Sequence, residues 1–184
     1  TSNTFSSGPV TTANTYGGSS NLLIPSGPQA GKVLVVHGNS LNSTSLYEMA
    51  SNTFSAGPNV SCALNSAGIY FAITSGSQNG KYLYLCASAN SSTSLYDPAT
   101  NSFSAGPDLS GSAGIGAQVI AINSGSDSGK TLILHGNNLT TSSLYDPAAN
   151  TFSAGSAAPL QLNYGAYHYK IAAGSNINKS LLIA

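Results

Sequence analysis

The sequence predicts an all-β fold built from one unit that recurs every 49 residues. Phenylalanine, lysine and tyrosine each recur at this step. The phenylalanines are Phe5, Phe54, Phe103 and Phe152, the lysines are Lys32, Lys81, Lys130 and Lys179, and the tyrosines are Tyr47, Tyr96 and Tyr145. The stretch 94–107 returns at 45–58 and at 143–155, and its second half also opens the chain. Short apolar runs between turn residues, repeated at this period, are typical of a protein assembled from similar small sheets.

Each repeat is expected to contain four short strands and to close at its phenylalanine. Apolar runs alternate with Gly, Pro, Asn and Ser turns, and no segment shows a helical stripe of useful length. The predicted strands span 20–24, 32–37 and 44–47, then 68–74, 81–86 and 93–96, then 117–123, 130–135 and 142–145, and finally 164–172 and 179–184. The turns that follow the first strand of each repeat span 25–31, 75–80, 124–129 and 173–178.

The strands that follow the repeated lysines are apolar on both faces. Val33 and Val35 point one way, and Leu34 and Val36 point the other way, because side chains alternate along a strand. Both faces must therefore be covered, as they are in a β-propeller, where each blade packs between two neighbours. The Asp-Pro pairs at 97–98 and 146–147 supply turn chemistry, since Pro fixes φ and Asp caps its own backbone.

The repeat resembles the long bacterial form of the Kelch repeat over essentially the whole chain. The strings at 31–36 and 94–103 and the pair Gly106-Pro107 carry the resemblance. It implies a β-propeller with four antiparallel strands per blade, as in galactose oxidase-like proteins. Phe replaces the family's usual tryptophan, and the family's paired glycines are replaced by His37-Gly38, Cys86-Ala87 and His135-Gly136.

Residues 1–184 are expected to form a single repeat domain. Its units span 11–59, 60–108 and 109–157, with partial units at 1–10 and 158–184. Dividing 184 residues by 49 gives about 3.76 repeats, so the terminal blade is split between the two chain ends. Three explanations stay open: a piece of a longer propeller, a compact four-blade ring, or an incomplete blade completed by neighbouring chains through unpaired strand edges.

The composition excludes several classes of partner. Only 5% of the residues are charged, there is no arginine, and the net charge is near zero, which argues against nucleic acid and against anionic lipid. No apolar run approaches the length of a membrane span, and we expect this sequence to contain no signal peptide. Five glycosylation acceptors fit an extracellular or cell-surface location, and they are Asn42, Asn59, Asn90, Asn138 and Asn178.

Two sets of residues could carry metal or redox chemistry. His37, Cys86 and His135 occupy the same repeat position and could converge on a metal ion, but we expect them to be strand-end residues with local hydrogen bonds. Cys62 and Cys86 are the only cysteines and could form a disulfide in an oxidising compartment or remain two buried thiols. We expect no cofactor.

Tyrosines form the candidate binding surface. Six of them cluster in two repeats, at Tyr70, Tyr82, Tyr84, Tyr164, Tyr167 and Tyr169. An aromatic face could bind glycan or protein, whereas ordinary sheet packing is the alternative. The pair Tyr167-His168 resembles a copper-binding pair of the galactose oxidase family, but the other copper ligands of that family have no counterpart here.

Three functions are candidates, and only the last of them would involve catalysis. The first is a non-catalytic extracellular propeller that binds protein or glycan through its loops. The second is a structural subunit that assembles with copies of itself into an oligomer or fibre. The third is a relic of a galactose oxidase-like copper enzyme. The lack of paired carboxylates at a catalytic spacing leads us to expect that the protein is not an enzyme.

Overall fold

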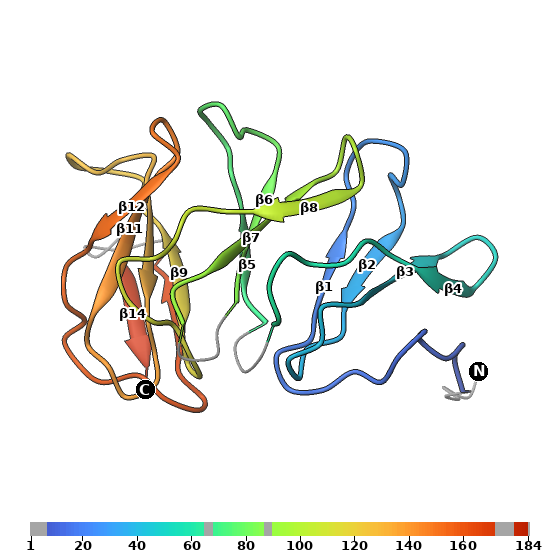
Figure 1. Ribbon diagram of the computed structural model, residues 1–184. Helices are drawn as coiled ribbons and strands as arrows, with labels where there is room; N and C mark the ends of the chain where they lie inside the picture. Colours follow the sequence, from blue (N-terminus) through green and yellow to red (C-terminus); the bar gives the residue numbers. More distant parts are fainter. Residues whose placement is uncertain (1–6, 65–67, 87–89, 172–178, 184) are drawn as a thin grey trace.

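The computed structural model describes residues 7–64, 68–86, 90–171 and 179–183, and over these residues it is all-β (Figure 1). Three four-stranded sheets and one two-stranded sheet follow one another, and every strand pair is antiparallel. Each sheet is a meander in which consecutive strands are neighbours. The all-β prediction is confirmed, and the arrangement is compatible with a propeller-like fold.

The strands recur with the period of the sequence. The first sheet contains β1 (Ser20–Leu23), β2 (Val33–Val36), β3 (Thr44–Glu48) and β4 (Thr53–Ala56). The second sheet contains β5 (Tyr70–Ala72), β6 (Tyr82–Leu85), β7 (Thr93–Asp97) and β8 (Ser102–Ala105). The third sheet contains β9 (Gln118–Ala121), β10 (Thr131–Leu134), β11 (Ser142–Asp146) and β12 (Thr151–Ala154). The fourth sheet contains β13 (Tyr167–Lys170) and β14 (Ser180–Ile183).

Every predicted strand is present within one to three residues of its expected ends, and the phenylalanine of each full repeat lies in the fourth strand. The predicted turn at 173–178 lies outside the described residues, as do Ala172 and Ala184. Phe5 also lies outside them.

The hairpin between the third and fourth strands is fixed by side chains of the repeated motif. In the second sheet the Tyr96 hydroxyl donates to Oδ1 of Asn101, at 3.0 Å, and Asp97 Oδ1 accepts from the amide of Ala99. Asn101 has φ 50°, a conformation that Asn tolerates better than most residues. The Tyr96 ring packs against Phe103 with centroids 4.9 Å apart. The same tyrosine–asparagine bond recurs at Tyr47–Asn52 and Tyr145–Asn150.

Successive sheets pack face to face, side by side in chain order (Figure 1). Leu34 and Leu46 of the first sheet share one buried cluster with Tyr84 and Tyr96 of the second sheet. A second cluster joins the second and third sheets through Leu83, Leu95, Ile133 and Tyr145, among others. A smaller cluster joins Leu134 to Leu162, Ala158 and Ala166, with Leu182 of the fourth sheet against it. Each interior sheet is therefore covered on both faces.

The first sheet departs from the expectation that both faces are covered. Leu23, Val33, Tyr47 and Phe54 are direct cross-strand neighbours and form one row on its outer face. Leu23 is 58% exposed, and the other three side chains are half-buried. The equivalent tyrosines of the next two sheets, Tyr96 and Tyr145, are 0% and 1% exposed. The difference arises because no described segment packs against the outer face of the first sheet.

Tight contacts between turns tie neighbouring sheets together. Gly27, in the turn between β1 and β2, lies against the carbonyl of Pro98 in the turn between β7 and β8, and Gly76 lies in the same way against Pro147. Both glycines have positive φ, 82° and 73°, and an added Cβ would overlap the proline carbonyl. Gly125 occupies the same repeat position with φ 80°, but nothing lies within 4 Å of its added Cβ.

Comparing Gly76 with Gly125 separates two contributions to stability: the contact between turns of neighbouring sheets, which only Gly76 makes, and the positive φ, which both residues have. We expect Gly125→Ala to cost about 1 kcal/mol, because alanine must adopt the left-handed conformation. Gly76→Ala should cost about 1–3 kcal/mol more, because its methyl group must also displace Pro147. Urea unfolding of both variants checks this difference. Equal losses would show that the turn contact does not couple the sheets.

Candidate functional site

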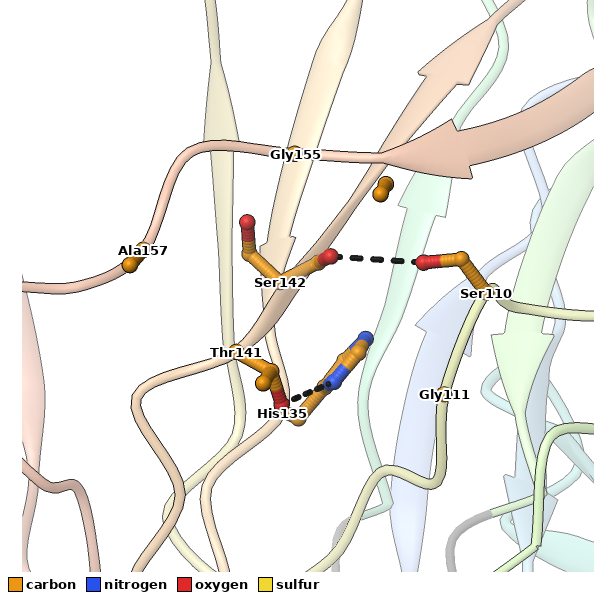
Figure 2. Close-up of a pocket in the computed structure, with 8 residues that line it drawn as sticks. Ser110, Gly111, His135, Thr141, Ser142, Gly155 and Ala157 are labelled. Carbon is orange, nitrogen blue, oxygen red and sulfur yellow. Dashed lines mark hydrogen bonds between the residues drawn. The ribbon is translucent and has the colours of Figure 1, made fainter.

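One candidate site of the described residues surrounds the buried His135, just after β10 (Figure 2). The imidazole is 1% exposed; its Nε2 lies 2.7 Å from Ser143 Oγ and its Nδ1 lies 2.9 Å from Thr141 Oγ1. Ser143 Oγ also accepts a 3.0 Å bond from the amide of Ser110, in the connection from the second sheet to the third. The ring therefore joins this connection to the third sheet, beside a cavity of about 230 Å³.

His37 makes the same contacts in the first sheet. Its Nε2 lies 2.7 Å from Ser45 Oγ and its Nδ1 lies 2.9 Å from Ser43 Oγ. Ser45 Oγ in turn accepts from the amide of Thr12 at 3.1 Å. The ring is fully buried, so His37 and Thr12 together fasten the segment before β1 onto the sheet.

Burial lowers the pKa of both His37 and His135 below the ordinary value of 6.5. Both rings are therefore neutral at pH 7, each with one N–H donor and one acceptor nitrogen. No carboxylate is among the partners of either ring. A buried neutral histidine that is held only by hydroxyl groups at two equivalent positions is explained by structural support rather than by acid–base chemistry.

In the second sheet a disulfide takes the place of this histidine. Cys86, fully buried at the position of His37 and His135, is bonded to Cys62. The repeat position of Cys62 holds Ala13 in the first repeat and Gly111 in the third. A Cβ on Gly111 would lie 2.8 Å from Cε1 of His135, so a small residue leaves room for the ring. The disulfide and the histidine thus make the same connection in different repeats.

The proposed metal set of His37, Cys86 and His135 does not come together. Each residue is engaged inside its own sheet, and Cys86 has no free thiolate because it is in a disulfide. Among the described residues, no three His, Cys, Asp or Glu side chains gather so that they could hold a metal ion.

Three of the six candidate tyrosines belong to the packing between sheets, the alternative that the sequence left open. Tyr84 is fully buried, and Tyr70 and Tyr82 pack beside it against the first sheet. Tyr70 stacks on Tyr84 with centroids 4.9 Å apart, and its hydroxyl donates to the carbonyl of Asn21 at 2.7 Å. These rings fill the interface between the first two sheets.

The other three candidate tyrosines are exposed on and beside β13. The exposed fractions are 78% for Tyr164, 46% for Tyr167 and 60% for Tyr169. Tyr167 and Tyr169 point to the same face of the strand, and their rings meet edge to face with centroids 5.5 Å apart. Leu181, 52% exposed, lies directly opposite Tyr169 on β14. The result is an aromatic and apolar surface, which we call the β13 face.

The opposite face of β13 carries His168 and Lys170. Because Tyr167 and His168 are consecutive strand residues, their side chains point to opposite faces, which does not suit a shared copper ion. His168 Nδ1 lies 3.2 Å from Oε1 of Gln118 on β9. Lys170 and Gln118 were not singled out from the sequence, although Lys170 stands where the other repeats have Leu23, Ala72 and Ala121.

The described glycosylation acceptors are exposed. Asn42, Asn59, Asn90 and Asn138 all lie in connections between strands, and Asn178 lies outside the described residues. The part of the chain that the structure describes holds no helix that is long and apolar enough to cross a membrane.

No protein-family model matches the chain, and no curated protein matches it.

The exchange of histidine for disulfide can be tested by making the second repeat resemble the first. The variant Cys62→Ala/Cys86→Ala should lose about 3 kcal/mol of stability, because a cross-link over a separation of 24 residues is removed. In Cys62→Ala/Cys86→His the new ring would face Ser92 and Ser94, the counterparts of Ser43 and Ser45. It should recover about 1 kcal/mol through these hydrogen bonds. Urea unfolding of both variants gives the comparison, and identical midpoints would contradict it.

Proposed function

We propose that the chain is part of a Kelch-type β-propeller that binds a glycan ligand without catalysis, outside the cell or at its surface. The repeated four-stranded meanders and their face-to-face packing support the propeller assignment. The disulfide supports an oxidising compartment. The neutral, hydroxyl-bonded histidines support a role in structure rather than in catalysis.

The observation that carries this proposal is the β13 face. Tyr169 stands at the repeat position of Leu22, Phe71 and Ile120, and Tyr167 stands at that of Gln118. Those positions face the next sheet in the earlier repeats, whereas the tyrosine rings lie open to solvent. Aromatic rings at an exposed surface offer flat apolar contact area with a polar hydroxyl at the edge. The C–H faces of a sugar ring fit such a surface, and its hydroxyl groups can bond to the phenols.

A third exposed ring precedes this face in the chain. Tyr164 is 78% exposed and lies three residues before β13, on the connection that leads from the third sheet. It gives a third ring that is available to a ligand longer than one sugar unit. We therefore expect oligosaccharides to bind more tightly than monosaccharides.

Substitution of the exposed tyrosines tests glycan binding. Tyr167→Ala and Tyr169→Ala should each reduce affinity for a glycan selected on an array by about tenfold, since each removes one stacking contact of about 1.4 kcal/mol. Neither variant should lower the urea midpoint, because both rings are exposed. Tyr16→Ala serves as the matched control, because Tyr16 is also 46% exposed but lies before β1, and it should leave glycan affinity unchanged. Selective capture of protein partners with no glycan bound would contradict the proposal.

Self-assembly is the second candidate function, and a specific observation favours it. The outer row of the first sheet, Leu23, Val33, Tyr47 and Phe54, corresponds to rows that are covered by a preceding sheet in the next two repeats. The β13 face corresponds to the surface that does the covering. The fourth sheet of one copy can therefore pack on the first sheet of a second copy. This head-to-tail contact would repeat, between copies, the face-to-face packing that joins successive sheets within the chain.

A charge in the outer row tests this contact. Val33→Lys should leave the fold intact, because Val33 is only half-buried, and should abolish head-to-tail association. Light scattering over a range of protein concentrations would show larger particles for the unmodified chain and monomers for the variant. A chain that stays monomeric at every concentration would rule out self-assembly through these faces.

A further inference from the structure

A cavity of about 290 Å³ lies between the third and fourth sheets, on the face of β13 opposite to the tyrosines. Its polar lining comes from Asn123, His168, Lys170 and Ser180, and its apolar lining comes from Val119, Ile120 and Ala121. Lys170 and Ser180 are direct cross-strand neighbours, so the cation and the hydroxyl lie side by side at one end of the sheet. The volume is close to the lower limit of known ligand pockets, about 300 Å³, which suits one sugar unit.

The residues of this cavity depart from the repeat. The positions of His168 and Lys170 hold Val119 and Ala121 in the third repeat, and Tyr70 and Ala72 in the second. None of these four counterparts is charged near neutral pH, and the fold of the earlier sheets forms without a charge there. The fold therefore does not require the histidine and lysine of β13, and ligand binding would explain their presence.

Lys170 is also distinct in its electrostatic surroundings. Lys32, Lys81 and Lys130 each form an ion pair, with Glu48, Asp97 and Asp127 respectively at 3.3, 3.2 and 3.0 Å. In the described part of the chain no carboxylate pairs with Lys170, and no acidic side chain lines the cavity. Lys170 is exposed and lines the cavity, and a cation there without a counter-ion favours an anionic ligand.

The hydrogen bonds of Gln118 determine which nitrogen of His168 is available. The Gln118 amide nitrogen donates to the carbonyls of Ala117 and Ala166, at 2.8 and 2.7 Å. This fixes its Oε1 as the acceptor that faces His168 Nδ1, so Nδ1 carries a proton. The other nitrogen, Nε2, is left to accept a proton or, once protonated, to donate to an anion.

We propose that this cavity binds the carboxylate of an acidic sugar unit, with Lys170 and protonated His168 on the carboxylate and Asn123 and Ser180 on the sugar hydroxyls. The inference rests on the proposed glycan-binding function and names the ligand class that it would recognise. The cavity and the β13 face lie on opposite sides of the same strand. They therefore bind different parts of a glycan or different glycans.

The binding should strengthen as the pH falls. Burial lowers the pKa of His168 below 6.5, so the free protein holds the ring neutral at pH 7. A bound carboxylate favours the charged ring, and binding therefore takes up a proton at pH values above the lowered pKa. The titratable groups among the lining residues are His168 and Lys170, both on β13, whereas β9 contributes Val119, Ile120 and Ala121 and β14 contributes Ser180. A sugar carboxylate stays ionised through this range.

Calorimetric titration of the full chain with galacturonate, galactose and inorganic phosphate tests the proposal. We expect galacturonate to bind with higher affinity at about pH 5.5 than at about pH 7.5. Galactose should bind at least about tenfold more weakly than galacturonate, because it lacks the carboxylate and so loses one charge-assisted hydrogen bond. Lys170→Gln should lose about tenfold in affinity for galacturonate. His168→Gln should remove the pH dependence. Equal binding of galactose, or of phosphate, would overturn the assignment to a sugar acid.

Two controls keep the outcome decisive. Lys81→Gln removes a lysine that is already paired with Asp97, so it should leave galacturonate affinity unchanged. Tyr169→Ala alters only the opposite face of β13, so failure of the cavity and failure of the glycan-binding function can be told apart. Loss of binding in Lys81→Gln as large as in Lys170→Gln would show a non-specific charge effect and overturn the site. The NMR titration of His168 with and without galacturonate gives a second readout, in which an unchanged pKa contradicts direct contact.

Discussion

A strand with large apolar side chains on both faces cannot remain half-covered in water, and this constraint organises the whole molecule. Leu83 and Tyr84 are consecutive residues of β6, and both are fully buried. Because they point to opposite faces, the second sheet needs a neighbour on each side. The first and third sheets provide these neighbours, each with a complementary row of side chains. Stacking of successive sheets therefore follows from the composition of one strand, repeated every 49 residues.

Local features of the fold could be read from the sequence because they depend on residues near one another in the chain. The Asp-Pro pairs predict turns, and the structure places each of them in a hairpin where the preceding tyrosine bonds to an asparagine five residues further on. The contacts between turns were not predictable in this way. Gly76 and Pro147 are 71 residues apart, and only the stacking of the sheets brings them together.

The tyrosines show why the candidate site was harder to predict than the fold. The strands that contain Tyr82 and Tyr84 and those that contain Tyr167 and Tyr169 have the same alternating pattern of aromatic residues. The first pair is covered by a preceding sheet, whereas the second pair faces away from the third sheet. Exposure depends on which neighbour covers which face, and the period of a strand does not contain that information. The disulfide is similar, since Cys62 approaches Cys86 only through the path of the connecting segment.

Residues that keep the repeat and residues that break it have different explanations. His37 and His135 recur with equivalent hydroxyl partners, and the disulfide at the same position of the second sheet joins the equivalent segments, so these residues support the fold. His168 and Lys170 break the repeat where uncharged residues suffice. Internal repeats thus serve as a control within one chain, because each unit shows what the fold needs at every position.

The β13 face cannot perform both of the functions that its position suggests. If Tyr167 and Tyr169 pack on the first sheet of another copy, their rings are buried in that contact and are closed to a glycan. Ligand binding and assembly through this face are therefore competitive, and a ligand that binds the tyrosines shifts the chain toward monomers. The cavity around His168 lies on the other side of the strand and is free of this competition. An acidic sugar unit can occupy it in either state, so occupancy of the cavity and assembly of the chain vary independently.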